Sequence, residues 1–353
     1  MRKLIVVTDI LIDKDKLSEE SVKNVFDSLK EYDIETTIVE SPKMSMEEFS
    51  EYAGIMEKNG VEGMEDDPVL VKEVADADYL ITHFSPVSSR IIEAGKNLKF
   101  IGVARSGCEN VCLKAAAEKG VKVAAAAGRL ADPVADYTVG ILLAECRNIS
   151  RLSLRPNDGK WTGKKPGNFK YVKCLRNKWV GIIGLGIIGK NVAERLSGFG
   201  VRLMAYDPFC PDSDFEKYDC KRVELPELMK TADFVCIHAR LTPETKGMVS
   251  KELINMMKPS AFIVNTARAD LLDEAALIQA LKEHKIAGAA LDVFSEEPLS
   301  EEHELRGFDN VTLTPHIAGG TSDQAEISFR IVTEELKRYL KGEKLINEKV
   351  YRG

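Results

Sequence analysis

The sequence predicts an α/β fold with two domains, each built on a doubly wound parallel sheet. Short apolar runs rich in β-branched residues alternate with segments of helical period, which is the pattern of parallel strands joined by crossover helices. The chain of 353 residues is also longer than a single hydrophobic core usually extends. The predicted strands form two series separated by one long apolar segment, so we expect two sheets.

The first series contains five predicted strands, at residues 3–9, 35–40, 78–83, 100–104 and 121–127, with a helix expected at 17–30. The segment 42–68 is longer than a minimal crossover needs. Within it, Ser45 and Glu48 form a capping box, and four apolar residues lie on one helical face: Phe49, Tyr52, Ala53 and Met56. We therefore predict an inserted helix and loop, which either adds to the local core or forms a wall of a ligand pocket.

The second series contains six predicted strands, at residues 178–184, 201–207, 233–239, 261–267, 287–294 and 310–316. Between the two series, Asp132 offers an N-cap and Pro133 a first-turn residue for a long, mostly apolar helix. Such a helix should be buried, in its own domain or against a second subunit. A last amphipathic helix is expected at 321–340, and the first domain would cover its apolar positions, Ile327, Ile331, Leu336 and Leu340.

Composition limits the classes of partner. The net charge of -7 leaves no positive surface for nucleic acid or for an anionic membrane. The seven cysteines are scattered without a C-x-x-C pair, so neither a disulfide framework nor a metal site is expected. The N-terminal apolar run soon meets Asp9 and Asp13, and no run reaches membrane-spanning length. The sequence predicts a soluble, cytoplasmic protein that binds small molecules.

The strongest single motif is G-x-G-x-x-G, formed by Gly184, Gly186 and Gly189 directly after an apolar strand and at the start of a helix. These glycines permit a tight turn, a close approach of the backbone to a pyrophosphate, and close packing of helix on strand. Asp207 ends the next strand, 23 residues beyond Gly184. A carboxylate there binds ribose hydroxyls and repels a 2′-phosphate, so the sequence predicts NAD rather than NADP as cofactor.

Charged residues also follow three later strands: Arg268, Asp292 with Glu297, and His316. Because ligands bind at the carboxyl ends of parallel strands, these side chains should face one crevice. Arg268 could hold a carboxylate, and Glu297 could bind one imidazole nitrogen of His316 and favour its charged form. This set suits acid-base catalysis on a ketone beside a carboxylate, although a structural salt-bridge network would use the same residue types.

Six ordered segments resemble the D-specific 2-hydroxyacid dehydrogenases: GIIGLGIIGK, AYDP, HARLTPETKGM, NTARADLLDE, AGAALDVFSEEPL and NVTLTPHIAGG. The resemblance runs from about residue 70 to 345. It implies that Arg268 orients the substrate, that His316 is the acid/base, and that Glu297 is its partner. It also implies cofactor contacts from Gly184, Gly186, Ile187, Ile188, Gly189, Asp207, His238, Ala239, Thr266, Ala267, Asp292, His316 and Gly319, with Asp292 near the nicotinamide carboxamide.

The same resemblance implies two Rossmann-like domains joined by hinges. A flavodoxin-like substrate domain would comprise residues 1–128 plus 320–353, and an NAD-binding Rossmann domain residues 129–319. The second hinge would lie at 318–320, where Pro315 fixes the preceding strand end and the glycines allow bending. The apolar helix after Pro133 matches the dimerisation element of the family, so a homodimer is expected.

On the substrate side, the segment VARSGCENV resembles the family loop whose amides receive the substrate carboxylate, which implies Ser106 and Gly107. Asn110 matches a loop-stabilising position. Arg105 could recognise a second anionic group or face solvent. His83 stands where phosphoglycerate-type members usually have arginine, which weakens that substrate assignment. The expected substrate contacts are His83, Arg105, Ser106, Gly107, Arg268 and His316, while His238 either lines the adenine pocket or packs at a strand end.

The leading hypothesis is an NAD-dependent oxidoreductase that interconverts a D-2-hydroxy acid and its 2-keto acid. Two other functions compete with it. Formate dehydrogenases resemble this chain but carry glutamine at the position of Glu297. Some members of the family act as NADH-responsive corepressors, which the acidic charge and the lack of a basic tail do not favour. The sequence does not predict which side chain the 2-hydroxy acid carries.

Overall fold

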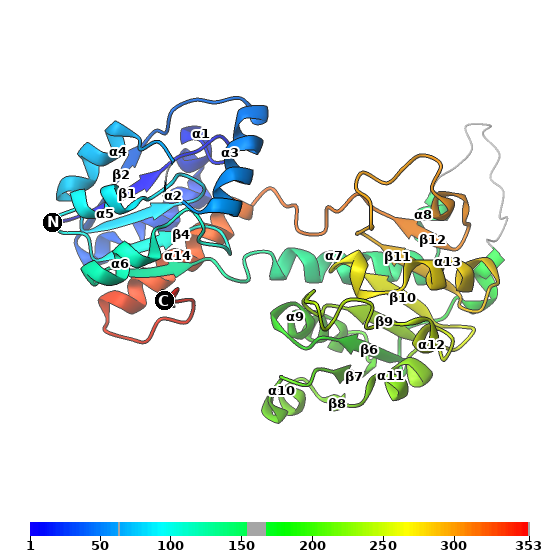
Figure 1. The fold of residues 1–353 in the computed structure, drawn as a ribbon. Helices are drawn as coiled ribbons and strands as arrows, with labels where there is room; N and C mark the ends of the chain where they lie inside the picture. The colour runs from blue at the N-terminus through cyan, green and yellow to red at the C-terminus, as the bar shows by residue number, and fades with distance from the viewer. Residues whose placement is uncertain (63, 154–166, 352–353) are drawn as a thin grey trace. The chain divides into compact units, whose positions relative to one another are not determined.

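The computed structural model describes residues 1–62, 64–153 and 167–351. The chain forms two compact units, one comprising Met1–Arg129 with Thr321–Gly353 and the other Leu130–Gly320 (Figure 1). The chain passes between the units after residues 129 and 320, one residue later at each crossing than the sequence predicts. Both units are α/β structures on wholly parallel sheets, so the predicted fold class is confirmed.

The first unit contains a five-stranded sheet in the order β2-β1-β3-β4-β5. Its strands are β1 (Arg2–Val7), β2 (Ile34–Val39), β3 (Tyr79–Thr82), β4 (Phe100–Val103) and β5 (Lys122–Ala125). Its helices are α1 (Lys14–Ser18), α2 (Glu20–Asp27), α3 (Met46–Asn59), α4 (Pro68–Glu73), α5 (Ser89–Ala94), α6 (Leu113–Lys119) and α14 (Gln324–Leu340), with short 3-10 turns η1 (Lys30–Tyr32) and η2 (Val74–Asp76). Alternate strand residues feed two separate cores, one on each face of the sheet.

Of two helical segments expected in this unit, one differs from the prediction and the other matches it. The helix predicted at 17–30 is interrupted at Glu19, whose extended backbone (ψ 138°) ends α1 before α2 begins. The inserted helix α3 is confirmed with its capping box, because Ser45 and Glu48 exchange hydrogen bonds as predicted. Phe49 and Met56 of this helix are buried.

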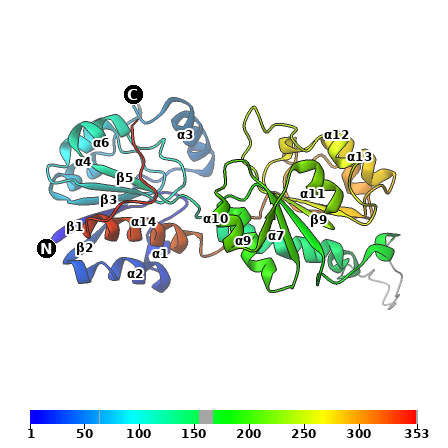
Figure 2. The same ribbon diagram turned by 90° about the horizontal axis from the view of Figure 1, so that it is seen from below.

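The last helix, α14, returns to the first unit as predicted. Its side chains Phe329, Val332 and Leu336 are buried in the same core as Phe26 of α2, and the rings of Phe26 and Phe329 lie 5.2 Å apart. Figure 2 shows α14 beside α2 on one face of the sheet. Segments from near the two ends of the chain, α2 and α14, therefore pack in the same core of the first unit.

The second unit contains a seven-stranded sheet in the order β12-β11-β10-β9-β6-β7-β8. Its strands are β6 (Trp179–Ile183), β7 (Arg202–Tyr206), β8 (Cys220–Arg222), β9 (Phe234–Ile237), β10 (Phe262–Asn265), β11 (Gly288–Leu291) and β12 (Val311–Leu313). Strand β8 was not predicted. It has three residues, two of them exposed and basic, at the edge of the sheet, so it carries no apolar pattern.

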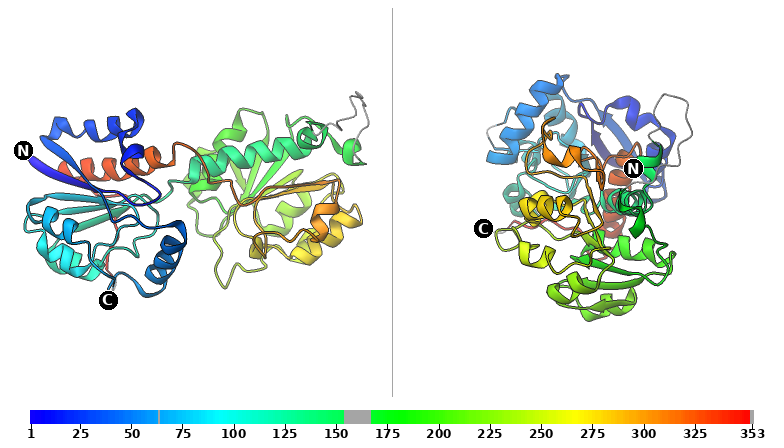
Figure 3. Two further views of the ribbon diagram at one scale, coloured as in Figure 1. Left: turned by 90° about the horizontal axis from the view of Figure 1, so that it is seen from above. Right: turned by 90° about the vertical axis from the view of Figure 1, so that its right-hand side faces the viewer.

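Helices cover both faces of this sheet (Figure 3). One core includes residues of α11 (Leu225–Thr231), α12 (Lys251–Ile254) and α13 (Glu274–Lys282), and the other includes residues of α7 (Ala131–Cys146), α9 (Ile187–Ser197) and α10 (Asp212–Lys217). The remaining short elements are α8 (Ile149–Ser153), η3 (Gly167–Tyr171), η4 (Ala269–Leu271) and η5 (Glu304–Gly307).

Helix α7 is the long apolar helix that was predicted, but its N-cap differs. Leu130 is the N-cap residue and provides no side-chain cap. The prediction of Asp132 as N-cap is wrong, because Asp132 lies in the first turn and accepts hydrogen bonds from Arg195 (2.9 Å) and Asn191 (3.0 Å). The apolar side chains of α7 are buried within its own unit.

Within the described residues, no helix combines the length and apolar character needed to cross a membrane. The seven cysteines are all free thiols.

Candidate active site

The glycine-rich turn after β6 has the shape that a pyrophosphate requires. Gly184 has φ +94°, and a Cβ atom there would lie 2.6 Å from the amide nitrogen of Ala239, so only glycine fits. A Cβ at Gly189 would meet the carbonyl oxygen of Gly184, which keeps helix α9 close to the strand. A Cβ at Gly186 would meet nothing within 4 Å, so the backbone there is open to a ligand. Ile187 and Ile188 begin α9, whose N-terminus favours an anion.

Asp207 follows β7 and lies against this turn. Its Oδ2 atom accepts a hydrogen bond from the amide of Leu185 (2.8 Å), and its Oδ1 atom accepts from the amides of Phe209 (2.9 Å) and Cys210 (3.0 Å). These bonds fix a carboxylate at the place expected for the adenosine ribose. The turn and the carboxylate together fit a dinucleotide.

His238 and Ala239 follow β9, beside Gly184. Neither ring nitrogen of His238 has a hydrogen-bond partner within the described residues, and burial lowers the pKa of His238 to about 4. The imidazole is therefore neutral at pH 7. Arg240 is exposed.

The turn after β10 carries Arg268 and is held by Asn265. The Asn265 side chain donates to the carbonyl of Arg268 (2.9 Å) and accepts from the amide of Ala267 (3.0 Å). Thr266 is tied to α7 through the hydroxyl of Thr138 at 2.8 Å. The guanidinium of Arg268 is exposed, and its Nη1 donates to the carbonyl of Ala267 (2.6 Å). Arg268 is thus presented to solvent from a fixed turn.

Asp292, which follows β11, is fully buried. Its carboxylate accepts hydrogen bonds from the hydroxyl of Thr314 (2.6 Å) and from the amides of Ile317 (3.0 Å) and Ala318 (2.8 Å). These partners lie on both sides of His316 in the chain. Asp292 therefore anchors the loop that holds His316, a connection the sequence did not reveal.

His316 and Glu297 form a hydrogen-bonded pair, with Nδ1 of the imidazole 2.7 Å from Oε2 of the carboxylate. His316 has φ +50°, a left-handed conformation that is uncommon outside glycine and concentrates at functional sites. Both side chains line a hollow of about 540 Å³ with Phe294 and Leu299.

The carboxylate of Glu297 is held from both sides, because Oε1 accepts from the amide of Phe294 at 3.0 Å. Partial burial opposes ionisation of Glu297. The hydrogen bond with His316, the bond from Phe294 and the nearby charges of His316 and Arg268 outweigh burial and lower the pKa of Glu297. The structure thus brings Arg268, Glu297 and His316 together within the second unit.

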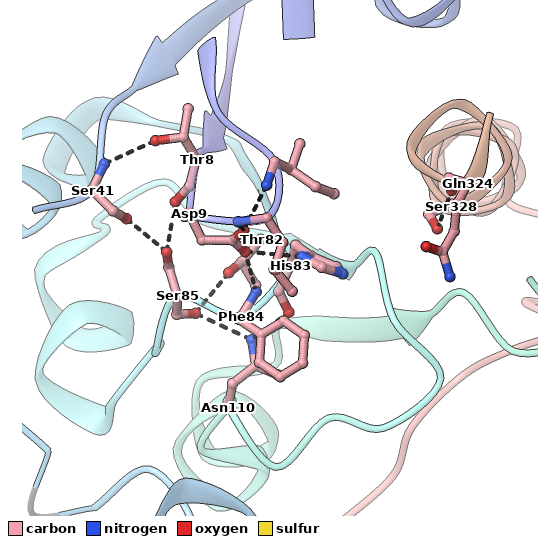
Figure 4. A network of polar contacts seen from close by, with 12 residues as sticks. Thr8, Asp9, Ser41, Thr82, His83, Phe84, Ser85, Asn110, Gln324 and Ser328 are labelled. Carbon is pink, nitrogen blue, oxygen red and sulfur yellow. Dashed lines mark hydrogen bonds and ion pairs between the residues drawn. The ribbon is translucent and has the colours of Figure 1, made fainter. Parts of the chain in front are cut away.

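In the first unit, the predicted substrate residues follow β3 and β4. Figure 4 shows one of them, His83, with Asp9 and Asn110. His83 is buried, and its Nδ1 atom lies 2.9 Å from Oδ2 of Asp9, which follows β1. Asn110 donates to the carbonyls of His83 (3.3 Å) and Ser85 (3.1 Å), as expected of a loop-stabilising residue. The hydroxyl of Ser106 donates to the carbonyl of Ala126 (3.4 Å), and Gly107 follows it.

Arg105 is buried, with 9% of its surface exposed, so the solvent-facing interpretation is wrong. Its guanidinium carbon lies 4.0 Å from the centre of the Phe84 ring, and Nη2 lies 3.5 Å from Oε2 of Glu109. Stacking on an aromatic ring fixes the plane of the guanidinium. The side chain is therefore held at the edge of the sheet.

The inserted helix α3 adds to the core and also lines a cavity. Phe49 is buried against Phe84, with ring centres 5.1 Å apart, so the helix adds to the core. Phe49 and Tyr52 also line a cavity of about 350 Å³ in the first unit, together with Phe84 and Asp9.

A sequence model for the D-isomer specific 2-hydroxyacid dehydrogenases, describing their NAD binding domain, matches residues 139–318, just over half of the chain. The chain belongs to the D-isomer specific 2-hydroxyacid dehydrogenase family. The resemblance seen in the motifs is confirmed. The second unit is an NAD-binding domain, and the predicted cofactor, NAD, is confirmed with it.

Two relatives illustrate the range of the family. The D-3-phosphoglycerate dehydrogenase of Methanocaldococcus jannaschii is 40% identical over 276 residues, 78% of this chain and 52% of that protein, so this chain spans about half the length of that relative. The hydroxypyruvate reductase of Thermotoga maritima is 38% identical over 272 residues, 76% of this chain and 87% of that protein.

The solved structures show the same fold. The D-isomer specific 2-hydroxyacid dehydrogenase of Lactobacillus delbrueckii ssp. bulgaricus, in its NAD complexed form, superposes with a TM-score of 0.73 over 98% of this chain and 99% of its own, at 23% identity. At that identity the likeness supports the fold alone.

Two residues that hold predicted site residues in place, Asp9 and Asn265, are not identified by the sequence analysis. Asp9 closes the first predicted strand, so its place at the carboxyl end of a strand was a signal that could have been used. Asn265 lies in the motif NTARADLLDE, but its role depends on a backbone turn that spacing does not reveal.

Proposed function

We propose that this chain is an NAD-dependent oxidoreductase that interconverts a D-2-hydroxy acid and the corresponding 2-keto acid. The observation that carries the proposal is the His316–Glu297 pair, at 2.7 Å, with the exposed Arg268 near enough for its charge to act on Glu297. An acid/base next to a carboxylate-binding cation is the set that this reaction needs. Family membership supports the same assignment.

Arg268, His316 and Glu297 each have a different role in the reaction. Arg268 binds the carboxylate in a bidentate manner and polarises the adjacent carbonyl. His316, in its charged form, donates a proton to the carbonyl oxygen during reduction and accepts it from the hydroxyl during oxidation. Glu297 keeps the imidazole oriented and stabilises its charged form. NAD, when bound, supplies the hydride chemistry.

For the cofactor, we propose contacts from the glycine turn with Ile187 and Ile188, from Asp207, and from the strand ends that carry His238, Ala239, Thr266, Ala267, Asp292 and Gly319. Gly186, whose Cβ direction is open, would face the pyrophosphate. Asp207 would bind the ribose hydroxyls, which favours NAD over NADP.

For the substrate, we propose that the first unit is the substrate-binding domain and that the amides of Ser106 and Gly107 receive the carboxylate. The names of the relatives, phosphoglycerate dehydrogenase and hydroxypyruvate reductase, support a short, polar acid. A formate dehydrogenase is not favoured, because Glu297 is a proton-accepting partner that formate oxidation does not need. The crossings at 129–130 and 318–320 are proposed as hinges.

We also propose that the protein is a homodimer formed around the helix after Pro133. The apolar residues of α7 are covered within their own unit. Immediately after it, however, Ile149 and Leu152 of α8 are 55% and 46% exposed. Ile149 and Leu152 are three residues apart, so both face the same side of α8 and would contribute to the dimer contact.

The test of the proposed function is NADH oxidation by the purified protein with a panel of 2-keto acids. The panel should include apolar, hydroxylated, dicarboxylic and phosphorylated side chains. We expect turnover of at least one member, with NADH preferred to NADPH. Binding of NADH without turnover of any member would favour the corepressor alternative.

A further inference from the structure

Two arginines lie together at the carboxyl edge of the first sheet. Arg105 follows β4 and Arg129 follows β5, and these strands are neighbours. Ala126 joins them, because its amide donates to the carbonyl of Arg105 (3.0 Å) and its carbonyl accepts from the amide of Arg129 (3.3 Å). The same carbonyl accepts from Ser106, a residue proposed to contact the substrate. The two arginines therefore arise from one patch of backbone beside the proposed substrate loop.

Arg129 has no anionic partner within the described part of the chain. Its Nη1 atom donates a long hydrogen bond to the hydroxyl of Ser328 (3.5 Å), and its Nε atom is buried without any hydrogen-bond partner among the described residues. Burial, and then the positive charge of Arg105, lower the pKa of Arg129. A half-buried guanidinium whose buried Nε donor is unused, beside a like charge, is costly unless an anion binds there.

His83 is an independent sign of a ligand at this edge. Its side chain is 4% exposed, Nδ1 is engaged by Asp9, and Nε2 is buried without a hydrogen-bond partner in the described residues. Its ring lies edge-on to Phe84 with centres 4.8 Å apart, and Phe84 is also the ring on which Arg105 stacks. Figure 4 shows the Nε2 end of the imidazole turned away from Asp9.

We propose that Arg129, Arg105 and His83 form a subsite for a second anionic group of the substrate, a carboxylate or a phosphate on its side chain. This inference rests on the proposed function and narrows the substrate class to 2-keto and 2-hydroxy acids with two anionic ends. Arg129 is the determining residue, because its Nε donor has no other partner in the described residues. Guanidinium donors match both carboxylate and phosphate oxygens.

The test compares kcat/KM for reduction of oxaloacetate, 3-phosphohydroxypyruvate and 2-ketobutyrate by the wild type, Arg129→Leu and Arg129→Lys. We expect the wild type to prefer one of the two substrates that carry a second anionic group, and the preferred one shows whether the subsite binds a carboxylate or a phosphate. Arg129→Leu should lower kcat/KM for that substrate by about 10- to 100-fold, the effect of losing one charged hydrogen bond, with 2-ketobutyrate little changed. Arg129→Lys should restore part of the loss.

Arg330→Leu is the matched control, because Arg330 is a 56% exposed arginine on α14 of the same unit. It should leave all three substrates unchanged. The subsite would be overturned if Arg129→Leu lost equally on 2-ketobutyrate, whose side chain is uncharged, and on the two substrates with anionic side chains. It would also be overturned if the wild type showed no preference for an anionic side chain.

A binding readout separates failure of the subsite from failure of the proposed reaction. Calorimetric titration with 2-phosphoglycolate and with malonate needs no turnover. If the wild type reduces no keto acid, the proposed function fails, and the subsite is then judged by binding alone. Binding that weakens about tenfold or more in Arg129→Leu supports the subsite. Equal binding by the two proteins, or no binding by the wild type, contradicts it.

Discussion

The Nδ1 atom of His316 lies 2.7 Å from the Oε2 atom of Glu297, and this pair is held at both ends. Glu297 is fixed by the amide of Phe294, and the loop on both sides of His316 is fixed by the buried carboxylate of Asp292. The carboxylate of Glu297 thus orients the imidazole of His316, while the carboxylate of Asp292 holds the backbone of its loop. Substitution of each residue should therefore have a different effect.

Substitution Glu297→Gln should remove an acid limb from the pH profile of keto-acid reduction. The pKa of Glu297 is lowered below its ordinary value of 4.5, so the carboxylate stays ionised above that value. In the wild type, kcat/KM should hold until pH falls below 4.5 and then decline as the Glu297 carboxylate takes up a proton. In Glu297→Gln, kcat/KM at pH 7 should be about tenfold or more lower, because the carboxylate that orients the imidazole is lost, and the acid decline should be absent. A variant with the wild-type profile would contradict this role of Glu297.

Substitution Asp292→Ala should act through the loop. It leaves two buried amides and one hydroxyl without an acceptor. The free energy of unfolding of the second unit should fall by about 2–4 kcal/mol. The value of kcat should fall as well, because His316 loses its fixed position. Chemical denaturation and steady-state kinetics measure the two effects. Full stability with lost activity would instead favour direct contact of Asp292 with the cofactor.

The two glycines Gly184 and Gly186 should respond differently to alanine. Gly184→Ala places a Cβ 2.6 Å from the backbone of Ala239 at φ +94°, so both stability and NADH binding should fall. Gly186→Ala meets no atom of the protein within 4 Å, so the fold should be kept while NADH binding weakens by about tenfold or more. Thermal melting and NADH fluorescence titration check this. Normal NADH binding by Gly186→Ala would remove that residue from the proposed site.

The Asp9–His83 pair should make the first unit sensitive to acid. Burial alone would raise the pKa of Asp9, but the hydrogen bond and charge of His83 and the backbone bonds lower it below its ordinary value of 3.8. A lowered carboxyl pKa gives stability that is present above the unfolded-state value and is lost as pH falls through the folded-state value. Asp9→Asn should therefore lower the free energy of unfolding, measured by chemical denaturation, by about 2 kcal/mol at pH 7, and this difference should shrink as pH falls below 3.8. A pH-independent difference would contradict this.

Much of the site was predictable because it depends on sequence-local chemistry. The glycine turn, Asp207 and the charged strand ends each follow a predicted strand directly, and parallel topology then gathers them at one edge. Asp292 was predicted as a cofactor residue, but its anchoring of the His316 loop depends on a loop conformation that residue spacing does not encode.

The errors have equally specific causes. Asp132 resembled an N-cap, but Arg195 and Asn191 supply its partners from a different helix. A solvent-facing position was one of two interpretations of Arg105. It is wrong because the ring of Phe84, at the end of the neighbouring strand, covers the guanidinium. Strand β8 owes its existence to pairing with β7 rather than to an apolar pattern. Each depends on a tertiary contact.

The most direct test of the central claim compares His316→Asn with His284→Asn. His284 is an exposed histidine with φ +52°, nearly the same backbone conformation as His316 at φ +50°, and asparagine tolerates that region. The account predicts that kcat/KM for NADH-dependent reduction of the preferred 2-keto acid falls about 10²- to 10⁴-fold in His316→Asn, with NADH affinity unchanged, and stays at the wild-type value in His284→Asn. Wild-type turnover by His316→Asn would contradict it.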